Sequence, residues 1–496
     1  MKKILKILRK YRRPLLIVAL IVLTVAGISF YKSRSTKLLD KAAYNEFKTA
    51  VETAGDTETG GFTDQQELVT LIEQWADDHS LEYTEDKHGN IIFDKPAAGR
   101  KANVSPTLIA VSLNYETAYD NAQVLAAAAS IALSDVESGR VTVVFFNDEQ
   151  GLAKGYKGFN KKMISSKTKI IYLDRGSSNY ISIGSFQERF SEIRIPAERE
   201  DNPCDTAIRI RITGITSGMP GPGINKQPDP FSALSSLLTR LKSKSVECRL
   251  ADVTIGSNGN MYPVSLEATI TLNSYNLSSF TSYIDKRIKA WDKSYGDEYE
   301  ELVYEYEIID DPELLPETVY TAETTDRITG LLYMVNSGSY KYAESDAMPE
   351  GKEVGDVYGI NCLTGIDAGD DEIRISIITQ GVDDSFTDRI INDNKAACEL
   401  YGCEYEETSR VEGFSNGKDS LLRTFTKTYE KVNKDVTGSA ELEVQTDNFF
   451  TPCSYLAKKN GKADIIHIRA KNSNMAGMAN SILCYIKAKG NTSIFK

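Results

Sequence analysis

The chain has 496 residues, of which 41% are hydrophobic and 26% charged, so it is long enough for several domains with real hydrophobic cores. This composition excludes a disordered chain, a collagen-like fibre and a polytopic membrane protein. The net charge of −12 is unevenly spread, because residues 1–41 carry eleven Lys and Arg against the single acid Asp40 and leave −22 for the remainder. An acidic body repels phosphate backbones, so we expect no nucleic-acid partner.

The N-terminus predicts a membrane anchor. Seven Lys and Arg lie within the first 13 positions, and residues 15–30 form the uncharged run LLIVALIVLTVAGISF. As a helix this run is about 24 Å long, and the flanking Tyr31 and Lys32 extend it toward the thickness of a bilayer. Basic residues before the run orient the N-terminus to the cytoplasm and the body to the outside. We therefore predict a basic tail and one transmembrane helix over residues 1–31, and a single-pass protein of the cell membrane.

The polar residues 32–61 are expected to form a partly helical stalk between the membrane and the body. A cleaved signal peptide is the alternative to the anchor, since Gly27 and Ser29 are small residues of the kind found at a cleavage site. The run is long for a signal peptide and lacks an Ala-x-Ala site, which favours the anchor.

Residues 62–204 alternate between strand and helix patterns. Strands are predicted at residues 91–93, 107–112, 141–146 and 170–173, and helices at 64–79 and 121–133. The strands are continuously apolar, which is typical of strands that are buried on both faces. Their alternation with helices predicts a doubly wound α/β sheet, parallel or mixed.

Residues 205–320 predict an inserted domain of a different class. Strands are predicted at residues 207–213, 247–255, 266–273 and 302–309, and helices at 230–241 and 280–291. The order β-α-β-β-α-β is that of a ferredoxin-like α+β domain. Beyond it, helices at 324–335, 388–400 and 475–488 and strands at 372–379 and 465–470 lead us to assign residues 321–496 to the second part of the α/β domain.

Several short motifs occur along this layout. They are DKHGNII at 86–92, YDN at 119–121, FNDEQ at 146–150, IYLD at 171–174 and TGITSG at 213–218. In this order, over about residues 60–490, they resemble the M20 metallopeptidase family, and within it the aminoacyl-histidine dipeptidase (PepD-like) branch. The resemblance implies a zinc-exopeptidase-like α/β domain interrupted by a lid domain that often mediates dimers. It also implies dipeptide hydrolysis by a water that bridges two divalent cations.

Only part of the family's site is present. By resemblance, Asp120 has the place of the bridging carboxylate, Glu149 that of the general base and Asp174 that of a further metal ligand. Gln150 stands where a second Glu ligand belongs. Two substrate-side histidines of the family are replaced by Thr216 and Gln445.

The imidazole ligands are missing as well. The family's first metal His falls on Leu113 or a neighbour, and its last falls among residues 472–476. The chain has three histidines, and His467 lies about eight residues too early for the last ligand and inside a predicted strand. Since two adjacent cations need about half a dozen placed ligands, we expect no resident cofactor. If the protein is active, a divalent cation (Zn, Mn or Mg) on Asp120 and Asp174 is the remaining option.

Each retained acid also has a plain structural interpretation. Asp120 could cap the helix that begins beside it, Glu149 could form hydrogen bonds within its loop, and Asp174 could open a turn.

The leading hypothesis is therefore a membrane-anchored, extracytoplasmic M20-like pseudoenzyme that binds a peptide, a cell-wall-type fragment or a partner protein. It would act as a homodimer through its lid. The alternatives are an atypical metal-dependent dipeptidase or amidohydrolase with a reduced oxygen-ligand site, and a cell-surface scaffold.

Overall fold

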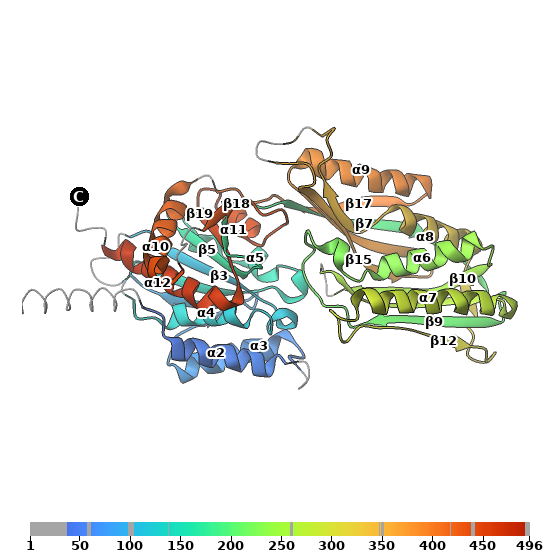
Figure 1. Ribbon diagram of the computed structural model, residues 1–496, viewed down its shortest axis with the longest axis horizontal. Helices are drawn as coiled ribbons and strands as arrows, with labels where there is room; N and C mark the ends of the chain where they lie inside the picture. Colours follow the sequence, from blue (N-terminus) through green and yellow to red (C-terminus); the bar gives the residue numbers. More distant parts are fainter. Residues whose placement is uncertain are drawn as a thin grey trace, which may run out of the picture.

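The computed structural model describes residues 37–56, 61–97, 104–136, 138–257, 261–346, 348, 352–416, 418–437 and 442–491. Two lobes lie side by side, each built on one large β-sheet (Figure 1). The predicted transmembrane helix lies outside the described residues. Within them, no helix combines the length and the apolar character that crossing a bilayer requires.

The sheet of the first lobe has eight strands. Their order is β1 (Thr84–Glu85), β2 (Ile91–Lys95), β4 (Val141–Asn147), β3 (Thr107–Leu113), β5 (Lys169–Arg175), β19 (Asp464–Ala470), β6 (Tyr180–Ser182) and β18 (Glu443–Gln445). The central strands β4, β3, β5 and β19 are parallel to one another. They are apolar and buried along nearly their whole length, as expected for strands that are covered on both faces.

Helices cover both faces of this sheet. One face carries α2 (Lys41–Ala54), α3 (Gln65–Asp78), α4 (Ala122–Leu133), α10 (Asp419–Thr437) and α12 (Met475–Asn491), and the other carries α5 (Lys154–Gly158) and α11 (Cys453–Lys459). The Ala-rich sequence of α4 permits close packing, and Ala126, Ala127 and Ala128 are fully buried. The predicted α/β sheet is thus confirmed as a mixed, three-layered one.

The predicted stalk is corrected in part. Residues 41–54 form α2, which packs along α4, and Phe47 and Val51 are fully buried in the core of the first lobe. The helix begins at Asp40, whose carboxylate accepts the backbone N–H groups of Ala42 and Ala43. The apolar residues of this segment recur at helical spacing among polar ones. The segment is therefore polar in overall composition although one face of the helix is buried.

The second lobe contains a nine-stranded antiparallel sheet. Its order is β12 (Val303–Ile309), β9 (Thr206–Thr213), β11 (Pro263–Leu272), β10 (Cys248–Ser257), β15 (Val357–Ala368), β16 (Glu372–Gly381), β7 (Gln187–Pro196) and β17 (Glu404–Val411), with β14 (Gly338–Lys341) paired to β15. A two-stranded ribbon joins β8 (Arg199–Asp201) to β13 (Thr318–Tyr320).

Four helices pack on one face of this sheet: α6 (Pro230–Ser243), α7 (Leu277–Tyr295), α8 (Ala322–Met334) and α9 (Asp384–Leu400). In Figure 1 they run roughly alongside one another, with α6 between α7 and α8. The β-α-β-β-α-β order of β9, α6, β10, β11, α7 and β12 has the elements expected for residues 205–320.

The structure differs from the assignment of all of residues 321–496 to the first domain. The segment from α8 to β17 belongs to the second lobe, because β15 and β16 continue the sheet of β10 and β7. The inserted lobe therefore runs from β7 to β17. Helix and strand patterns are alike in both lobes, and only long-range pairing decides which sheet a strand joins.

We predict that Phe47→Ala in the full-length protein lowers the free energy of unfolding by about 3–5 kcal/mol, because it removes a fully buried side chain from the core of the first lobe. Thr49→Ala, on the exposed side of α2, is the matched control and should change stability by about 0.5 kcal/mol or less. Denaturant unfolding measures both. Equal, small effects would mean that α2 is a detached stalk.

Candidate functional site

The carboxyl ends of the parallel strands meet at one edge of the first sheet. Leu113 lies opposite Asn147 at the ends of β3 and β4, and Arg175 lies opposite Ala470 at the ends of β5 and β19. In open α/β sheets this edge is the usual position of a ligand site. The acids singled out from the sequence follow these strand ends.

Asp120 is bound by an arginine. Its Oδ1 lies 2.8 Å from Nη1 of Arg175, and both side chains are about half exposed. The side chain of Asn472 approaches the same place, since its Nδ2 donates to the carbonyl oxygen of Asp120 at 3.5 Å. The predicted helix-cap role is wrong: α4 has Asn121 at its N-cap position, and no side chain caps it.

Glu149 also has a basic partner. It opens a short 3-10 turn, Glu149–Gly151, and its carboxylate lies 3.2 Å from Nζ of Lys154. Its backbone N–H donates to Oδ1 of Asn147, which fixes the turn on the end of β4. The side chain of Gln150 lies outside the described part of the chain.

Asp174 lies between two cationic groups, and its side chain is one third exposed. Its Oδ2 is 3.5 Å from Nη2 of Arg469 and 3.7 Å from Nε2 of His467. Burial alone would raise the pKa of Asp174, but the positive charge of Arg469 and the contact with His467 outweigh it, so the pKa is lowered. The carboxylate is therefore held in its ionised form.

His467 is the centre of a buried network that the sequence did not reveal. Its ring is fully buried, and Nδ1 lies 2.8 Å from Oδ2 of Asp447, itself almost fully buried. The other oxygen of Asp447 accepts the hydroxyl of Tyr180 at 2.8 Å. Burial lowers the pKa of His467, but Asp174 and Asp447 reverse this and raise it above the usual value.

The strand registers explain this network. In β19, His467 and Arg469 are two residues apart and so face the same side of the sheet. Arg469 lies opposite Asp174 on β5 and opposite Tyr180 on β6. The sequence DIIHIRA places His467 and Arg469 on one face of a strand, but two of their partners, Asp174 and Tyr180, lie almost three hundred residues away along the chain.

The described residues do not fit a pair of divalent cations. By the resemblance, the first imidazole falls on Leu113 or a neighbour, and Leu113 is apolar and fully buried. The last imidazole falls among residues 472–476, which contain no histidine. Asp120, Glu149 and Asp174 each have a basic partner already. Among the described residues no group of three or more His, Cys, Asp or Glu is arranged to hold a metal ion.

The two substrate-side positions, Thr216 and Gln445, lie in different lobes. Thr216 is exposed in the loop that follows β9 in the second lobe. Gln445 ends β18 in the first lobe, where its carbonyl oxygen accepts the N–H of Ile183 at 2.9 Å. No hydrogen bond or ion pair joins Thr216 or Gln445 to the three acids.

Side chains of the second lobe cover the turn that carries Glu149. A Cβ added at Gly151 would meet Cγ of Met261 at 2.8 Å and Sδ of Met219 at 3.3 Å, and Gly151 has a φ of +64°. Met261 is 2% exposed. Beside it, the hydroxyl of Ser217 donates to Glu116 at 3.3 Å. The lobes are therefore in direct contact above the candidate general base.

Two further carboxylates, those of Asp148 and Glu188, are buried near this contact. Asp148 accepts the hydroxyl of Ser112 at 2.7 Å, and Glu188 accepts Nε2 of Gln380 at 2.9 Å. Burial raises the pKa of Asp148 to about 6 and that of Glu188 to about 8, and Lys157 partly offsets both shifts. Glu188 is the second residue of β7, the first strand of the second lobe, and lies opposite Gln380 on β16, so it packs where the lobes join.

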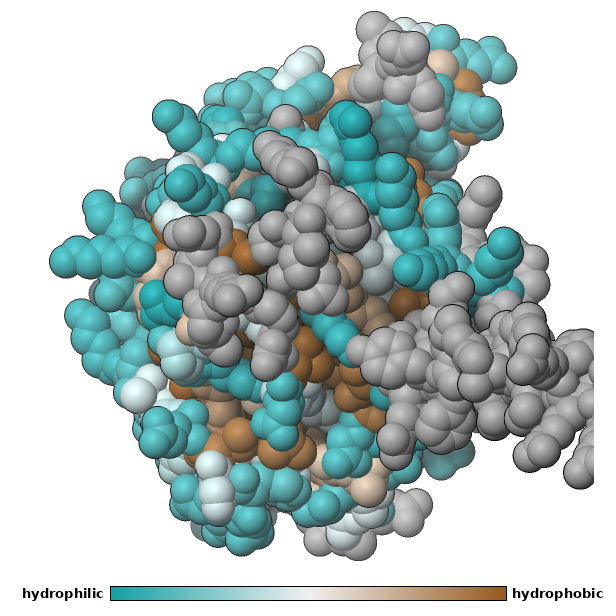
Figure 2. All heavy atoms as spheres, turned by 90° about the vertical axis from the view of Figure 1, so that its left-hand side faces the viewer, coloured by the Kyte–Doolittle hydropathy of each residue, from teal (hydrophilic) through white to brown (hydrophobic). Residues whose placement is uncertain are grey.

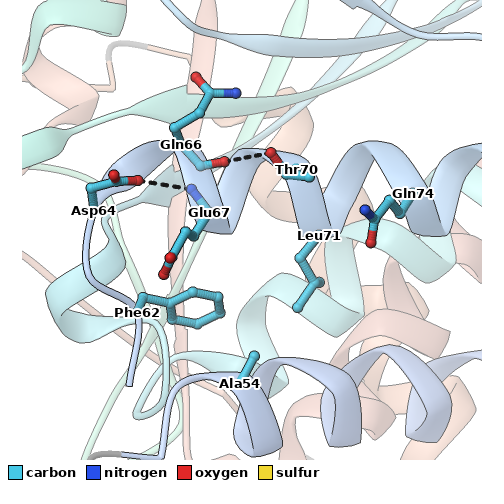
Figure 3. A pocket seen from close by; sticks show the side chains of 8 residues that line it. All are labelled: Ala54, Phe62, Asp64, Gln66, Glu67, Thr70, Leu71 and Gln74. Atoms are coloured by element: carbon cyan, nitrogen blue, oxygen red, sulfur yellow. Dashed lines mark hydrogen bonds between the residues drawn. The ribbon is translucent and has the colours of Figure 1, made fainter. Parts of the chain in front are cut away.

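A separate groove of about 420 Å³ lies between α3 and the end of α2 (Figure 3). Phe62, Leu71 and Ala54 line it with carbon, and the carboxylate of Asp64, which also lines it, accepts the N–H of Glu67 at 3.0 Å. None of the three candidate acids lines this groove.

Comparisons with known proteins concern the fold. No family model matches the sequence, and no curated protein is significantly similar to it. The aminoacylhistidine dipeptidase from Vibrio alginolyticus covers 91% of this chain and 97% of its own, with a TM-score of 0.53 and 14% identity. An amidase of the hydantoinase/carbamoylase family from Burkholderia vietnamiensis covers 92% of this chain and 98% of its own, with a TM-score of 0.51 and 11% identity.

The chain thus has the fold of M20-type peptidases and amidases, over nearly its full length. At these identities the likeness defines the architecture and leaves the chemistry to the residues at the strand ends.

We predict that the imidazole of His467 titrates above the usual value of about 6.5, and that Asp447→Asn lowers its pKa by removing one of two facing carboxylates. Because the folded pKa is raised, protonation stabilises the fold at low pH, and this contribution is lost as pH rises through the folded value.

NMR of histidine-labelled full-length protein measures this, since the chain has three histidines and His467→Asn identifies the signal. A His467 pKa at or below the usual value, unchanged in Asp447→Asn, would contradict the network.

Proposed function

We propose that the protein is an M20-type fold, of the dipeptidase-like branch, that has lost metal-dependent peptidase chemistry and acts as a binding protein at the cell surface. Its N-terminal segment would be the membrane anchor, and its ligand would be a peptide, a cell-wall-type fragment or a partner protein. Peptide hydrolysis by this fold depends on metal ions that polarise the carbonyl and activate water.

One observation carries this proposal: the acids at family ligand positions have counter-charges from the chain itself. Arg175 pairs with Asp120 at 2.8 Å, and Lys154 pairs with Glu149 at 3.2 Å. In a metal site these carboxylates would face divalent cations, and a fixed guanidinium beside them repels a cation. Each pair is partly exposed and contributes only modestly to stability. Its effect is local: the basic side chain offsets the negative charge that a cation would need.

The contact between the lobes supports the same proposal. Met219 and Met261 of the second lobe pack on Gly151, in the turn that begins at Glu149, so the protein's own side chains occupy the space beside the general-base position. A dipeptide would need this space in any mechanism in which Glu149 activates water.

The first described residues attach the chain to the body of the protein, close to the end of the proposed anchor. The N–H groups of Leu38 and Leu39 both donate to Oδ1 of Asn480 on α12, at 2.8 and 3.2 Å. If the membrane segment ends at residue 31, residues 32–37 can span at most about 20 Å, so the body would remain close to the bilayer. Figure 2 looks onto the left-hand end of Figure 1, where hydrophobic residues gather between hydrophilic ones on the described surface.

We predict that the purified full-length protein, supplied with Zn²⁺ or Mn²⁺, hydrolyses a dipeptide library no faster than its Glu149→Gln variant. The general-base variant is the matched control because it differs by a single charge. Release of free amino acids over time is the measurement. Turnover by the wild-type protein that Glu149→Gln abolishes would instead establish the alternative, an atypical metal-dependent dipeptidase.

A further inference from the structure

The largest groove that we describe lies on the second lobe, away from the strand-end acids. It has a volume of about 740 Å³, within the range of about 300–1,000 Å³ that is usual for small-molecule sites. Its floor is the outer side of α6, and its walls come from α7 and the end of α8, the helices on either side of α6 in Figure 1. The lining residues are Ser232, Ser235, Ser236, Thr239, Arg240, Ser243, Tyr283, Tyr333 and Asn336.

The outer side of α6 has an unusual composition for a solvent-facing helix. Apart from Arg240, its groove-facing positions are all Ser or Thr, at helical spacing, and the described lining contains no carboxylate. Close packing of α6 against α8 does not require hydroxyls, since alanine is as small and forms helices better. The hydroxyls therefore need a reason other than helix packing.

One of these hydroxyls is buried without a partner. Oγ1 of Thr239 is buried and unpaired, and Ser235, one turn earlier, is 8% exposed at the groove. Helical threonines elsewhere in the chain bond back to the carbonyl four residues earlier, as Thr329 does to Thr325 at 2.7 Å. An unpaired buried hydroxyl is costly, and once turned toward the groove the Thr239 hydroxyl would be satisfied by a ligand with its own donors and acceptors.

The walls are preorganised and aromatic. The hydroxyl of Tyr283 donates to the carbonyl oxygen of Ser236 at 3.3 Å, and its ring lies 5.8 Å from the guanidinium of Arg240. Arg287 donates to the hydroxyl of Ser236 at 3.0 Å. Tyr333, in contrast, is 64% exposed at the groove and offers a free ring face.

We propose that this groove binds a short neutral oligosaccharide. Sugar hydroxyls can donate to and accept from Ser235 and Thr239, while the apolar face of a pyranose ring packs on Tyr333. A cationic ligand would meet Arg240 without a compensating acid, and a purely apolar ligand would leave the hydroxyl of Thr239 unpaired. The inference concerns the second lobe alone and does not depend on whether Glu149 is catalytic.

The test is calorimetric titration of the full-length protein with maltotriose, cellotriose and tri-N-acetylchitotriose. We expect at least one to bind, with Tyr333→Ala weakening that binding tenfold or more. Tyr275→Ala is the matched control, because Tyr275 is 75% exposed outside the groove, and it should leave binding unchanged.

Thr239→Val separates ligand binding from folding. It replaces the unpaired hydroxyl by a methyl group of the same shape, so we expect an unchanged or higher melting temperature together with at least fivefold weaker saccharide binding. Absence of binding for all three saccharides, or binding that neither Tyr333→Ala nor Thr239→Val weakens, would overturn the proposal. Loss of self-association in Tyr333→Ala without any saccharide binding would also overturn it and make the groove a subunit interface.

Discussion

Carboxylates that gather at the end of a parallel sheet need nearby positive charge, and in this protein arginine, lysine and histidine side chains supply it. Arg175 neutralises Asp120, and Arg469 with His467 holds Asp174 ionised. In the function that we propose, these counter-charges oppose the binding of a metal at the strand ends.

The contact between the two lobes lies beside these ion pairs. In the proposed binding protein the strand ends carry ion pairs in place of metal ions, and Met261 and Met219 of the second lobe pack against Gly151 beside them. The buried acids Asp148 and Glu188 lie behind this contact, where water is excluded and their pKa values rise. Surfaces on the outside of the second lobe, above all the hydroxyl-lined side of α6, then remain for recognition.

Much of the fold could be predicted from local patterns. The apolar runs that became β3, β4 and β5 and the Ala-rich helix α4 are set by burial on both faces of a sheet, which short windows of sequence record. The extent of the second lobe could not be predicted, because β15 and β16 choose their sheet by pairing with distant strands. The strand ends near Asp120, Glu149 and Asp174 could be predicted from the sequence, and their role as a site stays a prediction. The basic partners Arg175, Lys154 and Arg469 could not be predicted, because these pairs form only when the strands and their loops are aligned.

The most direct test is diffraction from crystals of the protein soaked in Mn²⁺, with anomalous scattering used to locate the ion. The account predicts that Asp120 stays paired to Arg175 and Asp174 to Arg469, with no anomalous peak within coordinating distance of Asp120, Glu149 or Asp174. A peak bound by two or more of these carboxylates, with the basic side chains displaced, would contradict it.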